Sequence, residues 1–100
     1  MSARPYTTAR HNLARWFLYL LLCRDGSLYT GITTNVQRRL LEHNKGIASR
    51  YTRSRLPVRL IYQEQCLNKS NALKKEYEIK GLTRKKKEKY IKLKKRTVLS

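Results

Sequence analysis

The sequence has few acidic residues and a large excess of basic ones. Only six of its 100 residues are Asp or Glu, against 24 Lys and Arg, and the formal net charge is +18. A charge of this size attracts polyanions, so it points to DNA, RNA or an anionic membrane surface. Because acids are scarce, each one can be considered as a site residue: Asp25, Glu42, Glu64, Glu76, Glu78 and Glu88.

Cysteine, proline and glycine are also rare. Cys23 and Cys66 are 43 residues apart and form no CxxC or Cys/His cluster, which argues against a zinc site. Nothing requires a disulfide between them, and we interpret both as small buried side chains of a reduced, cytoplasmic protein. Two prolines and four glycines are too few for a fibrous or generally disordered chain.

Long hydrophobic segments are absent. The main apolar run, residues 16–23, has eight residues, whereas a membrane-spanning helix needs about 20. Arginines before this run imitate a secretory signal, but Leu22 is too large for a cleavage site and the polar turn 24–26 follows at once. We therefore expect no membrane partner and interpret the run as a central strand buried on both faces.

The length allows one domain, and we predict a flexible basic tail over 1–15 followed by a domain over 16–96. Periodicity and capping signals predict an α+β chain in the order β-β-α-β-α-α. Residues 47–57 read as a basic, hydroxyl-rich loop. The expected strands are 16–23, 27–33 and 58–63, and the expected helices are 36–45, 68–80 and about a dozen residues after Thr83.

The turn between the first two strands decides which side chains meet. A two-residue turn puts Tyr19 and Tyr29 on opposite faces of the sheet. A three-residue turn over 24–26, with its glycine left-handed, puts both on one face and Gly31 opposite Tyr19. We expect the three-residue turn. Glycine inside a strand often marks the close approach of a ligand, although tyrosines that merely fill a sheet face would give the same pattern.

The first expected helix carries a basic pair beside its apolar stripe. Arg39 lies one turn before His43, so both border the side that faces the core, whereas Arg38 points into solvent. An arginine and a histidine on one edge suggest an anion pocket, although a single helical histidine is commonly structural. The stripe comprises Val36, Leu40, His43 and Ile47.

The second expected helix places an acid among apolar residues. A partly buried carboxylate at Glu76 must be paired, protonated or metal-bound. A salt bridge to a nearby cation is one explanation. The other is a hard-cation site, since Mg²⁺ often binds one or two carboxylates together with phosphate and water. The expected inner face comprises Ala72, Leu73, Glu76, Tyr77 and Lys80, and the outer face comprises Lys74, Lys75 and Glu78.

Basic side chains are concentrated in the loop 47–57 and the last helix. Such side chains contact phosphates and give affinity without sequence information, although a solvated helix would have a similar composition. At Gly31 the bare backbone would allow nucleic acid to approach. The remaining candidates for nucleic-acid binding are Lys45, Arg50, Arg53, Arg55, Lys85, Lys86, Lys87 and Lys89.

Together these residues resemble the GIY-YIG nuclease superfamily. The chain is similar to the GIY-YIG domains of excision-repair nucleases and homing endonucleases. Phe17-Leu18-Tyr19 stands in place of Gly-Ile-Tyr, and Tyr29-Thr30-Gly31 in place of Tyr-Ile-Gly. Arg39, His43 and Glu76 match the downstream positions. Each tripeptide alone is a weak signal, whereas the ordered set is specific.

The resemblance implies a small three-stranded antiparallel sheet flanked by helices and hydrolysis of DNA phosphodiester bonds with one divalent metal, Mg²⁺ or Mn²⁺. Glu76 would hold the metal, which polarises the scissile phosphate. Tyr19 or Tyr29 would activate water. Arg39 would stabilise charge on the phosphate, and His43 would orient the tyrosine or relay its proton.

The resemblance covers about residues 15–95. Phe17 and Leu18 replace the first two residues of the family name, and Glu88 lies in the region where some members have an asparagine. We therefore predict an Mg-dependent endonuclease for double-stranded or branched DNA, with little sequence preference and a role in repair or recombination. The alternatives are a non-catalytic DNA- or RNA-binding module and an RNA-associated basic protein. The oligomeric state is left open.

Overall fold

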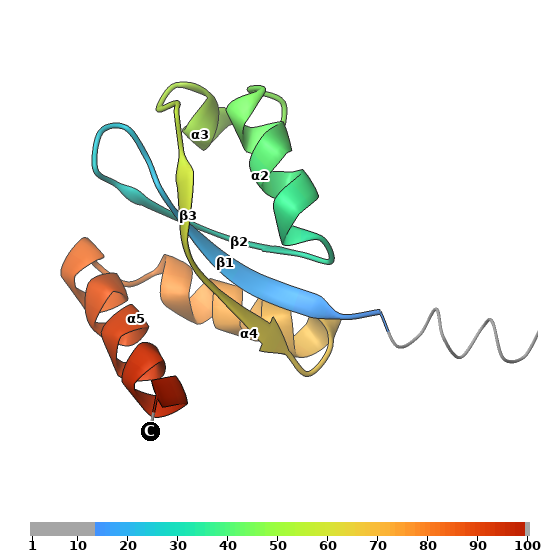
Figure 1. Cartoon of the computed structure of the whole chain (residues 1–100), viewed down its shortest axis with the longest axis vertical. Coiled ribbons are helices and arrows are strands. Elements are labelled where there is room, and N and C mark those ends of the chain that lie inside the picture. The colour runs from blue at the N-terminus through green and yellow to red at the C-terminus, as the bar shows by residue number, and fades with distance from the viewer. Residues whose placement is uncertain (1–13, 100) are drawn as a thin grey trace, which may run out of the picture.

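The computed structural model describes residues 14–99, so the predicted tail over 1–15 lies outside the described residues except at its last two positions. The elements follow the predicted order β-β-α-β-α-α, with one short helix added (Figure 1). They are β1 (Trp16–Leu22), β2 (Leu28–Thr33), α2 (Val36–Asn44), α3 (Arg50–Arg53), β3 (Arg59–Cys66), α4 (Lys69–Lys80) and α5 (Arg84–Leu99).

The three strands form one antiparallel sheet in the order β2-β1-β3. β1 is central because its apolar side chains can be buried on both faces, as expected from its composition. Tyr19 lies opposite Gly31 in the hairpin, which is the register of the three-residue turn. Gly26 has a φ of 89°, a left-handed conformation that glycine adopts without a steric penalty. The predicted register is therefore confirmed.

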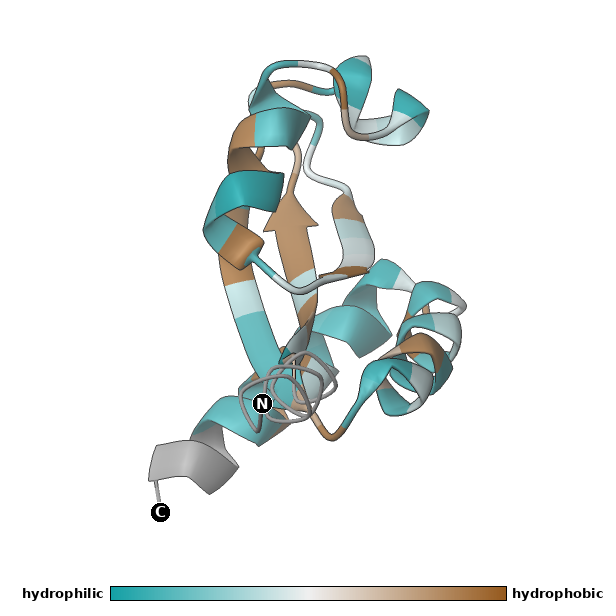
Figure 2. Cartoon of the chain, turned by 90° about the vertical axis from the view of Figure 1, so that its right-hand side faces the viewer, coloured by the Kyte–Doolittle hydropathy of each residue, from teal (hydrophilic) through white to brown (hydrophobic). Residues whose placement is uncertain are grey.

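Helices cover both faces of this sheet. Figure 1 shows α2 and α3 on one side and α4 and α5 on the other. Leu18 and Leu20 of β1 pack against α4 and α5, whereas Tyr19 and Leu21 pack toward α2. Figure 2 shows the hydrophobic colour concentrated in the strands and the hydrophilic colour on the helices outside them. The alternation of β1 therefore divides its side chains between two cores.

Two segments differ from the sequence prediction because of polar residues. The expected loop 47–57 contains α3, whose first turn is capped by the Ser49 hydroxyl accepting from the Thr52 backbone N–H. β3 continues to Cys66 because the polar residues 63–65 pair with β1. α2 and α4 begin after the N-caps Asn35 and Asn68.

The inner faces of two helices were predicted only in part. α2 ends at Asn44, which leaves Ile47 beyond it and 72 % exposed, so its place in the apolar stripe was wrong. On α4 the buried residues are Ala72 and Ile79, while Leu73, Tyr77 and Lys80, all expected on the inner face, are exposed. Lys75, expected outside, and Glu76, expected inside, are both half-buried. α4 is thus rotated by part of a turn from the predicted face.

Cys23 and Cys66 are buried free thiols, as predicted. Across residues 14–99, no helix has both the length and the apolar character to cross a membrane.

Glu64 joins three elements on the α4 and α5 side of the sheet. Its Oε1 accepts hydrogen bonds from the Tyr62 hydroxyl at 2.6 Å and the Tyr90 hydroxyl at 2.5 Å. Its Oε2 lies 2.5 Å from the Lys75 ammonium. Burial alone would raise the pKa of Glu64, but these donors outweigh it and lower the pKa. The carboxylate therefore ties β3 to α4 and α5.

Replacing Glu64 with Gln is expected to destabilise the fold by about 2 kcal/mol, because charge-assisted hydrogen bonds are lost. The carboxylate's contribution is present above the unfolded pKa of about 4.3 and is lost as pH falls through the lower folded pKa. Urea unfolding measured from pH 3 to pH 7 should show the free energies of unfolding of wild type and Glu64→Gln converging at acid pH. Glu88→Gln, at an exposed pair with Arg84, should cost little. Equal losses of stability in Glu64→Gln and Glu88→Gln would contradict the stabilising role of Glu64.

Candidate active site

The candidate site is built around the missing side chain of Gly31. The Tyr19 ring extends across β2, so that a Cβ at position 31 would lie 2.5 Å from the Tyr19 hydroxyl oxygen and 2.6 Å from Cζ. No larger residue fits there without displacing the phenol. The prediction that Tyr19 and Tyr29 share a face with Gly31 is confirmed by the register. Glycine is needed here for close approach rather than for its backbone angles.

Gly31→Ala is expected to lower the free energy of unfolding by about 1–3 kcal/mol, as overpacked cores do, and to displace the Tyr19 hydroxyl. Chemical denaturation measures the first effect, and the near-ultraviolet tyrosine signal reports the second. Gly81→Ala is the matched control, since its Cβ would meet nothing closer than 3.8 Å. A Gly31→Ala protein as stable as Gly81→Ala would mean that Tyr19 is easily displaced.

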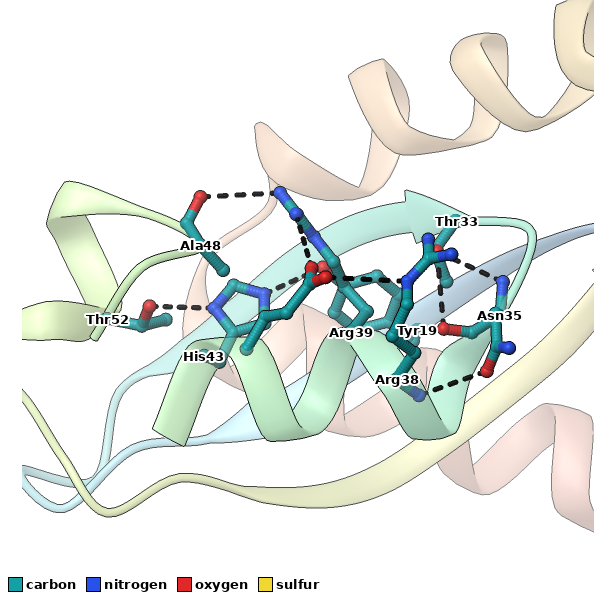
Figure 3. A network of polar contacts seen from close by, with 9 residues as sticks. Tyr19, Thr33, Asn35, Arg38, Arg39, His43, Ala48 and Thr52 are labelled. Atoms are coloured by element: carbon teal, nitrogen blue, oxygen red, sulfur yellow. Dashed lines mark hydrogen bonds and ion pairs between the residues drawn. The ribbon is translucent and has the colours of Figure 1, made fainter. Parts of the chain in front are cut away.

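Tyr19 begins a chain of buried hydrogen bonds (Figure 3). Its hydroxyl lies 2.8 Å from His43 Nε2, and His43 Nδ1 lies 2.7 Å from Thr52 Oγ1. The Thr52 hydroxyl lies 3.4 Å from the Ser49 carbonyl oxygen. One tautomer gives every donor an acceptor: Tyr19 donates to Nε2, Nδ1–H donates to Thr52, and Thr52 donates to Ser49. α2 and α3 thereby hold the phenol in one orientation.

Burial keeps this chain uncharged. It raises the pKa of Tyr19 to about 12, with the nearby Arg39 opposing the rise. Burial and the Arg39 charge together lower the pKa of His43 to about 4. His43 is therefore neutral near pH 7, with one nitrogen free to accept a proton from Tyr19.

Tyr29 lies in the same aromatic cluster but is less buried than Tyr19. Its ring centroid is 5.0 Å from that of His43 and 6.4 Å from that of Tyr19. Its other neighbour is Tyr51 of α3, stacked at 5.9 Å, and the Arg55 guanidinium lies over the Tyr51 ring at 3.8 Å. The cluster brings the two predicted tyrosines together with His43.

Arg39 is held at the edge of the cluster by contacts that the sequence analysis did not foresee. Its guanidinium donates to Glu42 Oε1 at 3.0 Å and to the Ala48 carbonyl at 3.3 Å. Glu42 is half-buried and also lies 3.4 Å from Arg38. Arg38 is the more exposed arginine, as predicted, at 56 % against 34 % for the Arg39 side chain. A guanidinium has five N–H donors, so Arg39 keeps donors for a ligand.

Glu76 projects from α4, on the other side of the sheet from Arg39 and His43. Its side chain is 21 % exposed, and its ion pair with Lys80 is long, at 3.8 Å. Its charge still reaches Tyr19 and contributes to the raised pKa of the phenol. α4 packs chiefly against β2, the strand of Gly31. Glu76 therefore lies near the tyrosines without contacting them directly.

The donor set around Glu76 suits a magnesium ion better than a transition metal. No cluster of three or more His, Cys, Asp or Glu exists among residues 14–99, so a fully protein-bound metal has no site in this part of the chain. Mg²⁺ binds through one or two carboxylates and takes its other ligands from water and phosphate. Within the described residues Glu76 has one ion pair, the long one to Lys80, and such a half-buried carboxylate fits that mode.

The predicted basic residues occupy different environments. Lys45, Arg50, Arg53, Lys85, Lys86 and Lys89 are exposed. Arg55 is half-buried and paired with Asp25 at 2.9 Å. Lys87 contradicts the expectation of a surface phosphate contact, because it is only 8 % exposed and donates to the Leu28 carbonyl at 3.0 Å. Lys87 is the fourth residue of α5, and at this position its side chain points toward the edge of β2.

Thr52, Glu42 and Tyr51 were missed as site residues. For Thr52, the cap signal at Ser49 was available in the sequence, because a serine three residues earlier begins a helical turn. Its contact with His43 depends on how α3 packs against α2, which no local pattern contains.

Comparison with known proteins identifies the family. The model of the GIY-YIG catalytic domain matches residues 15–97. This match covers most of the chain, so the chain belongs to the GIY-YIG family, a family of nuclease domains whose substrates are nucleic acids. The predicted resemblance to the GIY-YIG superfamily is therefore confirmed.

The relatives within this family are small UPF0213 proteins. A UPF0213 protein of Desulfotalea psychrophila is 56 % identical over 69 residues, which are 68 % of this chain and 63 % of that protein. The chain thus spans just under two thirds of that relative. A UPF0213 protein of Staphylococcus saprophyticus is 49 % identical over 75 residues, 75 % of this chain and 92 % of its own length.

Solved structures show the same fold. The solution NMR structure of a UPF0213 protein from Bacillus halodurans is 45 % identical, with a TM-score of 0.53 over 80 % of this chain and 85 % of that one. An NMR structure of a protein from E. faecalis is 47 % identical, with a TM-score of 0.57 over 79 % of this chain and 84 % of that one. The predicted α+β fold is therefore confirmed.

Proposed function

We propose that this protein is a divalent-metal-dependent DNA endonuclease with little sequence preference. The observation that carries the proposal is the gathering of Tyr19, Tyr29 and His43 over Gly31, with Arg39 at one edge and Glu76 within electrostatic reach. A nuclease needs a group that takes a proton from water and cations that stabilise a phosphate in the transition state. These side chains supply both.

Glu76 is the residue that would hold the metal. A bound divalent cation supplies Lewis-acid polarisation of the scissile phosphate. Arg39, already oriented by Glu42 and Ala48, would direct its remaining N–H donors at the phosphate oxygens. Because its guanidinium is fixed before substrate binds, little reorganisation is needed during the reaction.

We assign the role of general base to Tyr19. Its hydroxyl donates to His43 Nε2, which gives the phenolic proton an acceptor. Arg39 also hydrogen-bonds to this hydroxyl, and one oxygen lone pair is left for a water molecule. As Tyr19 takes a proton from the attacking water, its own proton moves to His43. The raised pKa of the phenol and the lowered pKa of His43 both oppose a separated phenolate and imidazolium, so a concerted transfer is preferred. Tyr29, the more exposed phenol, would contact the phosphate.

Tyr19→Phe is expected to lower the single-turnover cleavage rate by about 10²-fold, the lower end of general-base contributions. Binding of duplex DNA in the absence of divalent metal should be unchanged. Tyr29→Phe is the comparison. If Tyr29→Phe lowers the cleavage rate by the larger factor, Tyr29 is the general base instead of Tyr19.

The experiment that tests the proposed function compares plasmid, branched-DNA and matched RNA substrates in Mg²⁺, in Mn²⁺ and in EDTA. Cleavage of DNA in either metal, abolished by EDTA, is the expected result. Binding without cleavage of any substrate would favour a non-catalytic module instead. Stronger binding and cleavage of RNA would favour an RNA-directed protein, since A-form grooves present a different shape.

A further inference from the structure

A pocket of about 430 Å³ lies at the outer edge of β2, beside the candidate active site. It is bordered by residues of β2, α3, α4 and α5, and no carboxylate lines it. Two of its lining residues are lysines and two are tyrosines, of which Tyr29 also contacts His43. The lining comprises Leu28, Tyr29, Thr30, Tyr51, Lys80 and Lys87.

Lys87 brings a buried positive charge to this pocket. It is 8 % exposed, and its ammonium donates one hydrogen bond, to the Leu28 carbonyl at 3.0 Å. An ammonium has three N–H donors. Among the residues whose side chains the structure describes, no Asp or Glu forms an ion pair with it. Burial and the like charge of Lys80 lower its pKa. A buried cation without a counter-charge is costly.

Thr30 provides a second, independent observation. Its side chain is 1 % exposed, and its hydroxyl oxygen is buried without a hydrogen-bond partner. It is the one buried side-chain polar atom in this state within the described part of the chain. Native proteins leave few buried polar groups unsatisfied, because each costs free energy. Thr30, which carries this unpaired hydroxyl, and Lys87, which has no carboxylate partner among the described side chains, therefore line the same pocket.

We propose that this pocket binds a phosphate group of the nucleic-acid substrate, with Lys87 and Lys80 as its cationic ligands and Thr30 as a hydroxyl donor. An anion here supplies the counter-charge that Lys87 lacks. The Thr30 hydroxyl is closed to solvent in the free protein, so its contact requires neighbouring side chains to shift. The inference rests on the proposed function. Because Tyr29 borders both sites, the bound phosphate lies next to the one that is cleaved.

The first test measures binding of a fluorescent DNA duplex in EDTA, where cleavage is not required. Lys87→Met is expected to weaken binding about tenfold and to reduce the salt slope by about one, as for loss of one phosphate contact. Lys74→Met is the matched control, a lysine exposed on α4 and outside the predicted nucleic-acid-binding residues, and should weaken binding less than about threefold. Equal losses in the two variants would overturn the proposal.

Thr30→Val separates ligand binding from stability. Valine has the same shape as threonine and removes a hydroxyl that has no partner, so the free protein should melt at the same temperature or higher. The duplex should still bind more weakly than to wild type, by about threefold to tenfold, as for loss of one hydrogen bond. Unchanged duplex affinity in a folded Thr30→Val protein would remove this residue from the site.

Inorganic phosphate tests the anion chemistry without nucleic acid. Increasing phosphate at constant ionic strength should raise the melting temperature of wild type more than that of Lys87→Met, because a ligand stabilises the state that binds it. The same rise in both proteins would overturn the proposal. A stabilised wild type that binds duplex but cleaves nothing in Mg²⁺ or Mn²⁺ supports the phosphate site and contradicts only the endonuclease activity.

Discussion

Glu76→Gln is expected to lower the cleavage rate by about 10³-fold or more at saturating metal, because a bound metal contributes several kcal/mol to charge stabilisation. Glutamine keeps the size of the side chain and removes the charge that attracts a divalent cation. Since the ion pair between Glu76 and Lys80 is long, at 3.8 Å, the thermal melt should change little. The measurement is single-turnover cleavage of duplex DNA against metal concentration.

Glu78→Gln is the control for this prediction. Glu78 lies two residues further along α4 and is exposed, so its removal changes the net charge by the same amount without altering the candidate site. It should cleave at nearly the wild-type rate. If both variants lose activity equally, or if folded Glu76→Gln cleaves normally, Glu76 has no place in the metal site.

Arg39→Ala is expected to lower the cleavage rate by about 10²–10³-fold, the effect of losing a preorganised charge stabiliser. Its guanidinium is held by Glu42 and Ala48, and its charge acts on both Tyr19 and His43. Lysine at position 39 should rescue only part of the rate, because it lacks the planar pair of N–H donors. Binding of DNA should fall far less than the rate.

Arg38→Ala tests whether position on the helix matters rather than charge alone. Arg38 precedes Arg39, shares the Glu42 contact and is more exposed. Its loss should reduce DNA affinity modestly, as for an exposed phosphate contact, and leave the rate at saturating DNA nearly unchanged. Equal rate losses in the two folded variants would show that both act through Glu42 or through general charge.

Glu42 contacts both arginines, so each alanine variant leaves Glu42 with the other partner. The two substitutions are therefore coupled, and the double variant is not expected to show the sum of the single effects.

Local sequence signals were enough to predict the hairpin register and the shared edge of Arg39 and His43. Arg24-Asp25-Gly26 specified the hairpin register, because a left-handed glycine at the third position matches a three-residue turn. That register put Tyr19 opposite Gly31. Helical spacing put Arg39 and His43 on one edge of α2. Each of these relations spans a few residues or one hairpin, where backbone geometry alone decides which side chains are neighbours.

Relations between distant segments were decided only by tertiary packing. Lys87 and Leu28 are 59 positions apart, and the contact that buries this lysine depends on where α5 lies against β2. The partners of Glu64 come from β3, α4 and α5, while Thr52 meets His43 because α3 rests on α2.

The sequence by itself therefore determined the order of the strands and of the three longer helices, the hairpin register and the types of side chain available for phosphate chemistry. The tertiary structure decided which basic residues remain on the surface, which carboxylate joins elements together and which hydroxyl orients the histidine. The physical reason is that turn and helix geometry depend on neighbouring residues. The burial of a charged or polar side chain depends instead on surfaces that meet only when the chain has folded.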